Sequence, residues 1–169
     1  MDNRRRRFEA QALPHLDAAY NLARWLSRSS VDAEDIVQDA MLRAYRAFDG
    51  FRGGDVKPWL LAIVRNCCRN AVAETRRHAR ATLPDNDWDG IPSNDADPEE
   101  QAARASEKRK IDEAITRLPS DFREVLILRE MEEMSYRDIA QATDTPIGTV
   151  MSRLSRARAI LKDKLEDCT

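Results

Sequence analysis

The sequence predicts an all-α protein with two small helical domains joined by a flexible acidic linker, the C-terminal one containing a helix-turn-helix. Good helix formers dominate, and apolar residues recur at helical spacing along most of the 169 residues. Residues 83–98 interrupt this pattern with three of the seven prolines, which is typical of a linker. No alternating run flanks an Asn-Gly or Asp-Gly pair, so no β-hairpin is expected.

A glycine-rich segment interrupts the helical pattern of the N-terminal half of the chain. The expected helices cover residues 8–27, 32–48 and 57–78. We expect Asp32 to cap the second of them. Residues 49–55 (DGFRGGD) form a turn-rich loop before the third helix. Pro58 falls in the first turn of that helix, where proline is tolerated.

The C-terminal half has its own start and stop signals. The expected helices cover residues 99–118, 121–131, 135–143 and 145–165. Pro119 ends the first, and Ser120 can cap the second. Ser135, with Asp138 three residues on, resembles a capping box for the third, and Pro146 starts the last. The expected domains cover residues 1–81 and 105–169, with the linker over 82–104.

Charge is segregated along the chain, although the net charge is only −2. Between residues 82 and 103 there are seven acidic residues and no Lys or Arg. Residues 65–80 carry five Arg against one Glu, and residues 147–164 carry five Lys or Arg against one Asp. Two basic helical segments beside an acidic tether indicate nucleic-acid contact at two places. The alternative is two solvated helix faces.

The composition favours a soluble, cytoplasmic protein. No apolar run approaches the roughly 20 residues that span a bilayer, and no apolar segment follows the basic N-terminus as in a signal peptide. Cys67, Cys68 and Cys168 do not make a disulfide framework, and we interpret them as ordinary thiols, with redox sensing as the alternative. The run from Arg4 to Arg7 either keeps the terminus soluble or touches DNA.

The C-terminal pattern is specific for a helix-turn-helix. Ile139 and Ala140 supply the apolar and small residues needed where the second helix crosses. Asp144 occupies the turn position often filled by Gly, and it tolerates the left-handed conformation. On the second helix, the residues expected on the buried stripe are Val150, Leu154, Ala157 and Leu161.

The opposite face of that helix is short, polar and basic. Its residues are Thr149, Ser152, Ser155 and Arg156, with Arg153 and Arg158 on the flanks. Small hydroxyls permit close approach to a major groove, and Arg156 can reach a guanine edge or a phosphate. The alternative is a helical hairpin whose polar face meets only water.

The helix expected over residues 57–78 has a second candidate nucleic-acid face. Its core stripe consists of Leu60, Ile63, Val64, Cys67 and Ala71. The opposite rows consist of Arg65, Asn66, Arg69, Asn70, Arg76 and Arg77. Arg can hold phosphates and Asn can read base edges of single-stranded DNA, and aromatic residues such as Phe51 and Trp59 can stack on bases. For Trp59, packing under the loop as core is the competing interpretation.

The second expected helix has one outward-facing leucine. Leu42 projects among Asp35, Gln38, Asp39 and Arg46, opposite the core face. An apolar centre with a polar rim is typical of a small protein-docking patch. A lone exposed Leu is also ordinary, so both interpretations stand.

These segments, in this order, resemble the sigma-70 family of RNA polymerase sigma factors, specifically the short extracytoplasmic-function (ECF) group. The N-terminal match is DAEDIVQDAMLRAYRAFDGFRGGDVKPWLLAIVRNCCRN. The C-terminal match is LPSDFREVLILREMEEMSYRDIAQATDTPIGTVMSRLSRARAIL, in which the Gly-Thr-Val-x-Ser-Arg-Leu string is highly specific. The resemblance covers nearly the whole chain, and the acidic linker stands where longer sigma factors have an additional domain.

The resemblance implies a stress- or signal-responsive initiation factor that binds core RNA polymerase and promoter DNA, both as duplex and as the non-template single strand. It also implies an anti-sigma factor as inhibitor. The residues it implies for polymerase binding are Asp35, Gln38, Asp39, Leu42 and Arg43. For melting and minus-ten capture it implies the loop 51–58 with Asn66, Arg69 and Asn70. For the minus-thirty-five element it implies Thr149, Ser152, Arg153 and Arg156. Some relatives carry Arg or Lys at Met151 and an aromatic residue at Ser155, which leaves the base contacts there open.

Two other classes of protein compete with this interpretation. A stand-alone helix-turn-helix repressor or activator would bind duplex DNA alone, usually as a dimer, but leaves the helix over 57–78 and Leu42 without a role. An enzyme, such as a nuclease, is disfavoured because His15 and His78 lie outside any catalytic constellation. No phosphate-binding glycine loop or metal-ligand spacing occurs, so we expect no catalytic residue, cofactor or metal.

Overall fold

The computed structural model describes residues 2–27, 29–78 and 98–167, and these residues are helical apart from short turns. The N-terminal module contains α1 (Asn3–Ala12), η1 (Leu13–His15), α2 (Leu16–Ser27), α3 (Ser30–Ala47), η2 (Phe48–Gly50) and α4 (Val56–His78). The C-terminal module contains α5 (Pro98–Thr116), α6 (Ser120–Leu126), η3 (Ile127–Met131), α7 (Tyr136–Thr143) and α8 (Ile147–Glu166). The all-α prediction is confirmed. Most of the expected linker, residues 82–97, lies outside the described residues, whereas 98–104 belong to α5.

The N-terminal module packs α2, α3 and α4 against one another. Small residues such as Ala23 and Ala40 are fully buried between them, and they let the helices approach closely around Leu22 and Val64. The expected single helix over 8–27 is divided into α1, η1 and α2. Pro14 lies in η1, because proline cannot donate the hydrogen bond that a continuous helix needs there.

Two local features fix where the helices of this module begin. Ser29, not Asp32, caps α3: its hydroxyl accepts a hydrogen bond from the Asp32 amide at 3.3 Å. The expected cap is therefore wrong, because serine also caps well and lies three residues earlier. Before α4, Gly53 and Gly54 have φ values of 91° and 90°, a conformation that side-chain-bearing residues rarely adopt.

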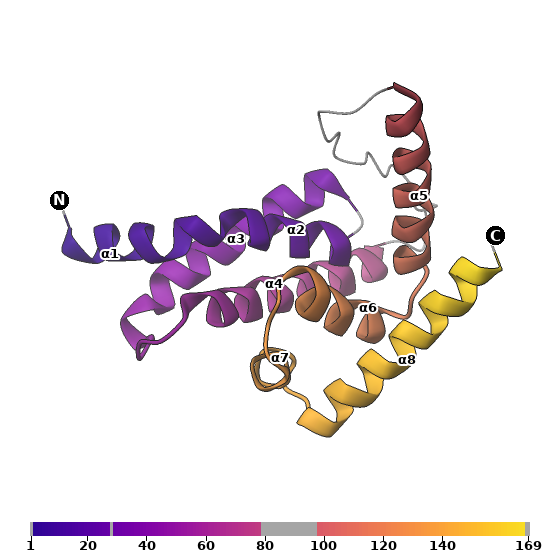
Figure 1. Ribbon diagram of the computed structural model, residues 1–169. Coiled ribbons are helices and arrows are strands. Elements are labelled where there is room, and N and C mark those ends of the chain that lie inside the picture. Colours follow the sequence, from indigo (N-terminus) through magenta and orange to yellow (C-terminus); the bar gives the residue numbers. More distant parts are fainter. Residues whose placement is uncertain (1, 28, 79–97, 168–169) are drawn as a thin grey trace.

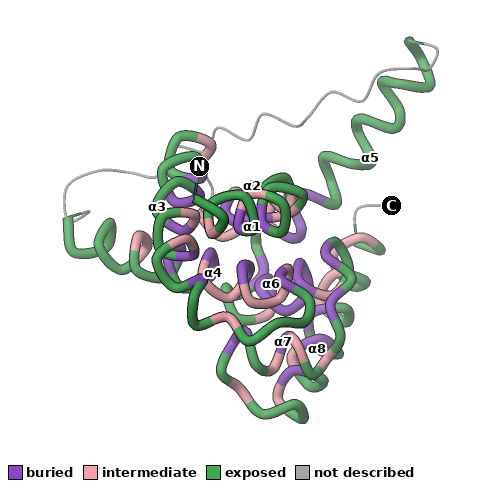
Figure 2. Tube along the Cα trace, turned by 90° about the vertical axis from the view of Figure 1, so that its left-hand side faces the viewer, coloured by how far each residue is buried: buried purple, intermediate pink, exposed green. Residues whose placement is uncertain are grey.

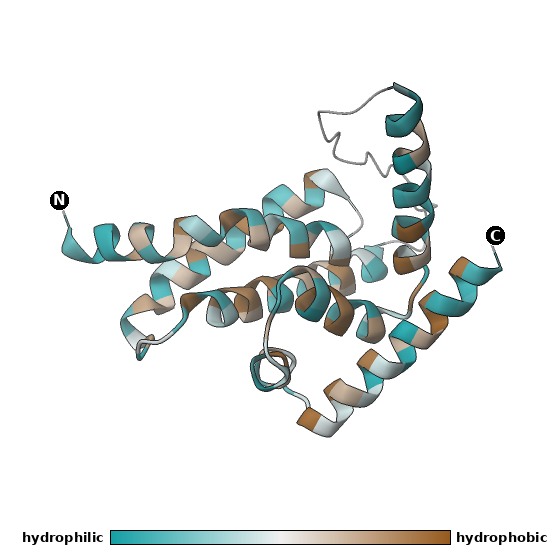
Figure 3. Ribbon diagram, viewed as in Figure 1, coloured by the Kyte–Doolittle hydropathy of each residue, from teal (hydrophilic) through white to brown (hydrophobic). Residues whose placement is uncertain are grey.

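The C-terminal module is built from α6, α7 and α8, with α5 attached through its last turns. Residues 98–111 of α5 are all exposed, and the helix projects from the rest of the molecule in both orientations (Figures 1 and 2). The expected helix over 121–131 is α-helical only to Leu126 and continues as the π-helical segment η3. Apolar residues recur in bands along α4 and α8 (Figure 3), as expected for helices with one buried face.

The two modules lie directly against each other. Helix α4 packs on α7, and α2 contacts α6 and η3. Buried residues of both modules, including Leu61, Val64, Ile127 and Leu128, belong to one apolar cluster. Both candidate nucleic-acid helices, α4 and α8, are therefore held in one compact body.

Candidate nucleic-acid interface

Helices α7 and α8 form the expected helix-turn-helix. The Ser135 hydroxyl accepts a hydrogen bond from the Asp138 amide at 3.1 Å, so the expected cap is confirmed. Asp144 adopts the left-handed conformation with φ of 51°, as its place in the turn required. The Thr143 hydroxyl donates to the Ile139 carbonyl at 2.7 Å. The Thr143 hydroxyl also lies 2.8 Å from that of Thr145, and the Thr145 amide donates to the Ala140 carbonyl at 3.0 Å, so these two bonds close the turn before α8.

The outward face of α8 is accessible. Val150, Leu154 and Ala157 are buried, as expected, and Leu161 is half-buried. On the opposite side the exposed residues are Ser152, Ser155 and Arg156, and Thr149 is half-buried. This helix therefore presents the small polar and basic surface that the sequence indicated.

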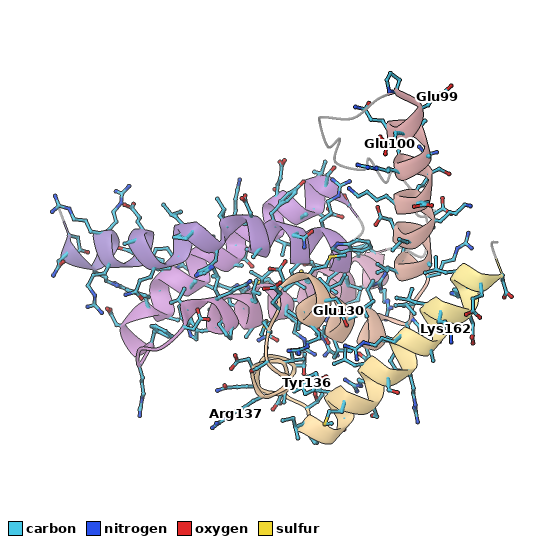
Figure 4. All side chains as sticks on the ribbon, viewed as in Figure 1. Glu99, Glu100, Glu130, Tyr136, Arg137 and Lys162 are labelled. Atoms are coloured by element: carbon cyan, nitrogen blue, oxygen red, sulfur yellow. The ribbon has the colours of Figure 1, made fainter. Side chains whose placement is uncertain are left out.

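The arginines flanking this face already have partners. Arg153 is half-buried, and its guanidinium lies 3.7 Å from the Asp121 carboxylate. Arg158 donates to Glu130 at 2.9 and 2.5 Å. Glu130 belongs to η3, which precedes α7 (Figure 4). The ion pair with Arg158 therefore joins η3 to α8. Arg156 appears in no such pair among the described residues.

Helix α4 presents a second polar and basic face. The exposed residues among those predicted for it are Asn66, Arg69, Asn70, Arg76 and Arg77. Leu60, Val64 and Cys67 are buried on the other side. One face thus offers amides that can read bases beside cations that can hold phosphates.

An aromatic cluster lies at the start of α4. Phe51 and Trp59 are half-buried, with ring centroids 5.0 Å apart, and Trp59 also lies 6.3 Å from the Phe48 ring. Phe48 is buried in the core below them. Trp59 therefore packs on core aromatics as the competing interpretation expected, and because it is only half-buried its contact with DNA stays a prediction.

Arg65 does not lie on the exposed face, and its expected orientation is wrong. It is only 6% exposed, and its guanidinium pairs with the Glu124 carboxylate of α6. A second, longer hydrogen bond joins Arg65 Nη2 to Glu124 Oε2 at 3.4 Å. The reason is that α4 has a second buried side, containing Leu61 and Cys68, which faces the C-terminal module.

The candidate docking surface on α3 is exposed as expected. We call it the α3 surface, and it consists of Asp35, Gln38, Asp39, Leu42 and Arg43. Leu42 is 57% exposed, and Asp39 pairs with Arg43 at 2.9 Å, one helical turn apart. The hydrogen bond and charge of Asp39 raise the pKa of Arg43. The result is an apolar centre within a polar rim.

Several structural roles had no signal in the sequence. Arg4 donates to the Tyr45 carbonyl at 2.8 Å and pairs with Asp49 at 3.2 Å, so this member of the arginine run anchors α1. Glu132 is 7% exposed and contacts both Lys57 and Asn21 across the modules. Glu132 stands between other acidic residues in a charged segment, so its place in the sequence gives no sign that it will be buried.

The adjacent cysteines are both buried, Cys67 on the side of α4 near Asp39 of α3 and Cys68 on the side that faces the C-terminal module. Burial raises the pKa of Cys68 from 9.0 to about 12, and burial, followed by the nearby Asp39, raises the pKa of Cys67. Both thiols are therefore protonated at neutral pH, and the thiolate is the reactive form.

We expect slow alkylation of both core thiols in the native protein. In a Cys168→Ser variant at pH 8, iodoacetamide should modify neither Cys67 nor Cys68 until denaturant is added. The raised pKa of Cys68 favours the folded state below its ordinary value of 9.0. This contribution is lost as the pH rises from 9 towards 12, so the free energy of unfolding should fall over that interval. Rapid labelling of the native protein would contradict this.

Within the residues that the structure covers, no helix is long and apolar enough to cross a membrane. In the same residues, no group of three or more His, Cys, Asp or Glu is placed to hold a metal ion.

Comparison with known proteins gives two family matches. Residues 13–78 match Sigma-70 region 2, and residues 108–161 match Sigma-70, region 4. The first covers α2 to α4, and the second covers the helix-turn-helix. Helix α1 precedes the matched residues.

Curated relatives and solved structures lead to the same family as these two matches. The chain is 36% identical over 152 residues to the ECF RNA polymerase sigma-E factor of Haemophilus influenzae, covering 86% of this chain and 79% of that protein. It is 35% identical over 149 residues to the Escherichia coli sigma-E factor, covering 81% and 75%. It is 32% identical to ECF sigma factor SigE of Mycolicibacterium smegmatis, covering 89% of this chain but 58% of that protein.

The fold match extends across both modules. The sigma factor RpoE, in complex with the anti-sigma factor NepR from Bartonella quintana, superimposes with a TM-score of 0.80 at 30% identity, covering 94% of this chain and 96% of that one. CnrH, in complex with the cytosolic domain of CnrY, gives 0.70 at 25% identity, covering 98% and 91%. Fold and surfaces together define a helical factor of the transcription machinery. The chain belongs to the sigma-70 family, and within it to the ECF RNA polymerase sigma factors. This family consists of initiation factors, not enzymes.

Proposed function

We propose that the chain binds core RNA polymerase through the α3 surface and places α8 and α4 on the two elements of a promoter. The observation that carries this proposal is the presence of three accessible surfaces in one chain: the polar faces of α8 and α4, and Leu42 within its charged rim. A stand-alone helix-turn-helix protein would need only the first of them.

Helix α8 would read the minus-thirty-five element as duplex DNA. Thr149 and Ser152 lie in its first turns, where a recognition helix meets base edges. Arg156 lies one turn further on, and its long side chain can reach a guanine edge or a phosphate. Arg153 would add a phosphate contact after exchanging Asp121 for DNA.

Helix α4 and the loop before it would capture the non-template strand of the minus-ten element. Asn66 and Asn70 supply base contacts, and Arg69, Arg76 and Arg77 supply phosphate contacts. Flipping one base costs a few kcal/mol, which stacking on the aromatic cluster would help to offset. Once one element is bound, tethering raises the effective concentration of the second module at its own element.

Regulation and location follow from the family. The sigma factor RpoE of one solved structure is bound to the anti-sigma factor NepR, and we propose that an anti-sigma factor also restrains this chain. We further propose that it works in the cytoplasm, where polymerase is, on the promoters of a stress- or signal-responsive regulon.

The proposal is tested by transcription in vitro. The full-length protein is added to core polymerase and a library of promoter fragments, and transcript starts are sequenced. We expect defined start sites, each preceded by two conserved elements, and none with either component alone. Absence of defined starts, or tight duplex binding without polymerase, would overturn the proposal in favour of a stand-alone DNA-binding protein.

A further inference from the structure

Helix α1 is fixed beside the aromatic cluster by a small core of its own. Phe8 of α1 is buried, and its ring lies edge-on to those of Tyr45 and Phe48, with centroids 5.3 Å apart in both cases. Phe51 and Trp59 pack against the same apolar cluster. Since α1 ends before the residues matched to Sigma-70 region 2, the family match gives no role to this rigid neighbour of the candidate minus-ten site.

Arg7 of α1 lies over one ring of the aromatic cluster. Its guanidinium carbon is 5.7 Å from the centroid of the Phe48 ring, and the Phe48 ring stacks on that of Phe51 with centroids 6.2 Å apart. Phe51 in turn contacts Trp59. A continuous row of side chains therefore leads from the cation on α1 to the rings on which the proposed function stacks a base.

Two exposed arginines next to this cluster are not neutralised by carboxylates. Arg7 and Arg52 are both exposed and, among the residues that the structure describes, neither takes part in an ion pair. Arg5, by contrast, pairs with Glu9 at 2.7 Å. Arg7 lies over Phe48 and Arg52 follows Phe51 directly, so both border the aromatic cluster. We call these two arginines the basic edge, and a phosphate is the ligand that such a guanidinium binds well.

The position of the basic edge indicates which part of the DNA it meets. The polar face of α4 runs from Asn66 to Arg77, and the chain continues from there to the module that would read the upstream element. The loop before α4 lies at the other end of that helix, next to the N-terminal part of α1 (Figure 1). Transcription starts downstream of the minus-ten element, so a strand captured at the aromatic cluster continues past α1.

We propose that the basic edge binds phosphates of the non-template strand where this strand leaves the aromatic cluster towards the start site, with Arg7 as the main contact. The contact depends on charge and not on base sequence, because it is made to the backbone. It holds the strand on one side of the captured base, while Arg69 and Asn70 hold it on the other. The inference rests on the proposed function of α4 and extends its DNA surface to α1.

The test uses core polymerase reconstituted with the full-length factor, on a promoter found by the transcription assay. Three labelled non-template oligonucleotides are compared: the minus-ten element alone, the element extended towards the start site, and the element extended away from it. Fluorescence anisotropy gives the Kd of each at several salt concentrations. Any gain in affinity that the polymerase itself provides is the same for every variant of the factor.

Arg7→Gln removes the charge but keeps most of the side chain that covers Phe48. We expect it to weaken binding of the oligonucleotide extended towards the start site by about threefold to fivefold, as for other exposed charge contacts. The salt slope of that binding should fall by about 0.7, the value for one phosphate of a single strand. The other two oligonucleotides should bind as they do with the wild type.

Two further variants separate a phosphate contact from other effects. Arg5→Gln is the matched control, because it removes the same charge from the same helix at a residue already paired with Glu9. At about 100° per residue, Arg5 and Arg7 fall on opposite flanks of Phe8, so Arg5→Gln should leave all three Kd values unchanged. Arg7→Lys should retain most of the affinity, because lysine also binds phosphate, as a point charge.

Three results would overturn the inference. The first is an Arg7→Gln factor that binds the oligonucleotide extended towards the start site as the wild type does, and the second is an equal loss on all three oligonucleotides. The third is weaker binding of Arg7→Gln to core polymerase without DNA, which would assign the basic edge to a protein contact. If Asn70→Ala still weakens all three oligonucleotides, the proposed function of α4 stands without the inference. If even the wild type shows no preference for the element, the proposed function itself fails.

Discussion

Leu42→Asp is expected to abolish measurable binding to core polymerase while leaving the fold intact. Leu42 is 57% exposed, so its replacement removes little core packing, and such surface changes usually alter stability by less than about 0.5 kcal/mol. In the complex, the same side chain would be the central apolar contact. Truncating such a contact costs about 2 kcal/mol or more, roughly thirtyfold in Kd. An unpaired carboxylate buried there adds further cost.

The measurement is a fluorescence titration of labelled factor with core polymerase, accompanied by thermal melting followed by circular dichroism. Val31→Asp is the matched control, because Val31 is 67% exposed on the same helix but lies outside the α3 surface. It should bind polymerase as the wild type does. If Leu42→Asp bound within threefold of the wild type, the α3 surface would not be the docking site.

Local chemistry explains why much of the fold could be predicted from the sequence. Ser135 and Asp144 mark the two ends of α7, and each acts through its own backbone neighbourhood, which the sequence contains. The buried stripe of α8 follows from helical periodicity alone, and Val150, Leu154 and Ala157 lie on it. Predictions that depend on a few neighbouring residues therefore held at these positions, whereas the equally local prediction of Asp32 as the cap of α3 was wrong because Ser29 is the cap.

Predictions that depend on contact between the modules failed. Periodicity assigns one buried side to α4, and Arg65 falls outside that side. The C-terminal module creates a second buried side, on which Arg65 meets Glu124. A helix that packs against two partners buries a wider part of its circumference than its apolar stripe indicates. Glu124, the partner of Arg65, lies 59 residues away in the sequence. Nothing in the sequence near α4 indicates that distant partner.

Arg156→Ala is expected to weaken recognition of the minus-thirty-five element and to leave polymerase binding unchanged. Arg156 is exposed on α8, opposite the buried Val150 and Leu154, so its loss should not disturb the fold. A good arginine contact to a base contributes about 1–3 kcal/mol. The affinity of the polymerase-bound factor for its promoter should therefore fall by about tenfold, as measured by DNA binding of the reconstituted complex.

Arg158→Ala is the control, because it removes the same charge from the same helix at a residue already paired with Glu130. It should reduce promoter affinity less than Arg156→Ala does. The affinity of the Arg156→Ala variant is then measured on a set of promoters with single base-pair changes, which identifies the contact that Arg156 makes. Loss of preference at one base pair indicates a base edge, whereas a uniform loss with a salt slope reduced by about one indicates a phosphate. Unchanged affinity on every promoter would remove Arg156 from the interface and leave the hydroxyls of Thr149 and Ser152 as the polar contacts of α8.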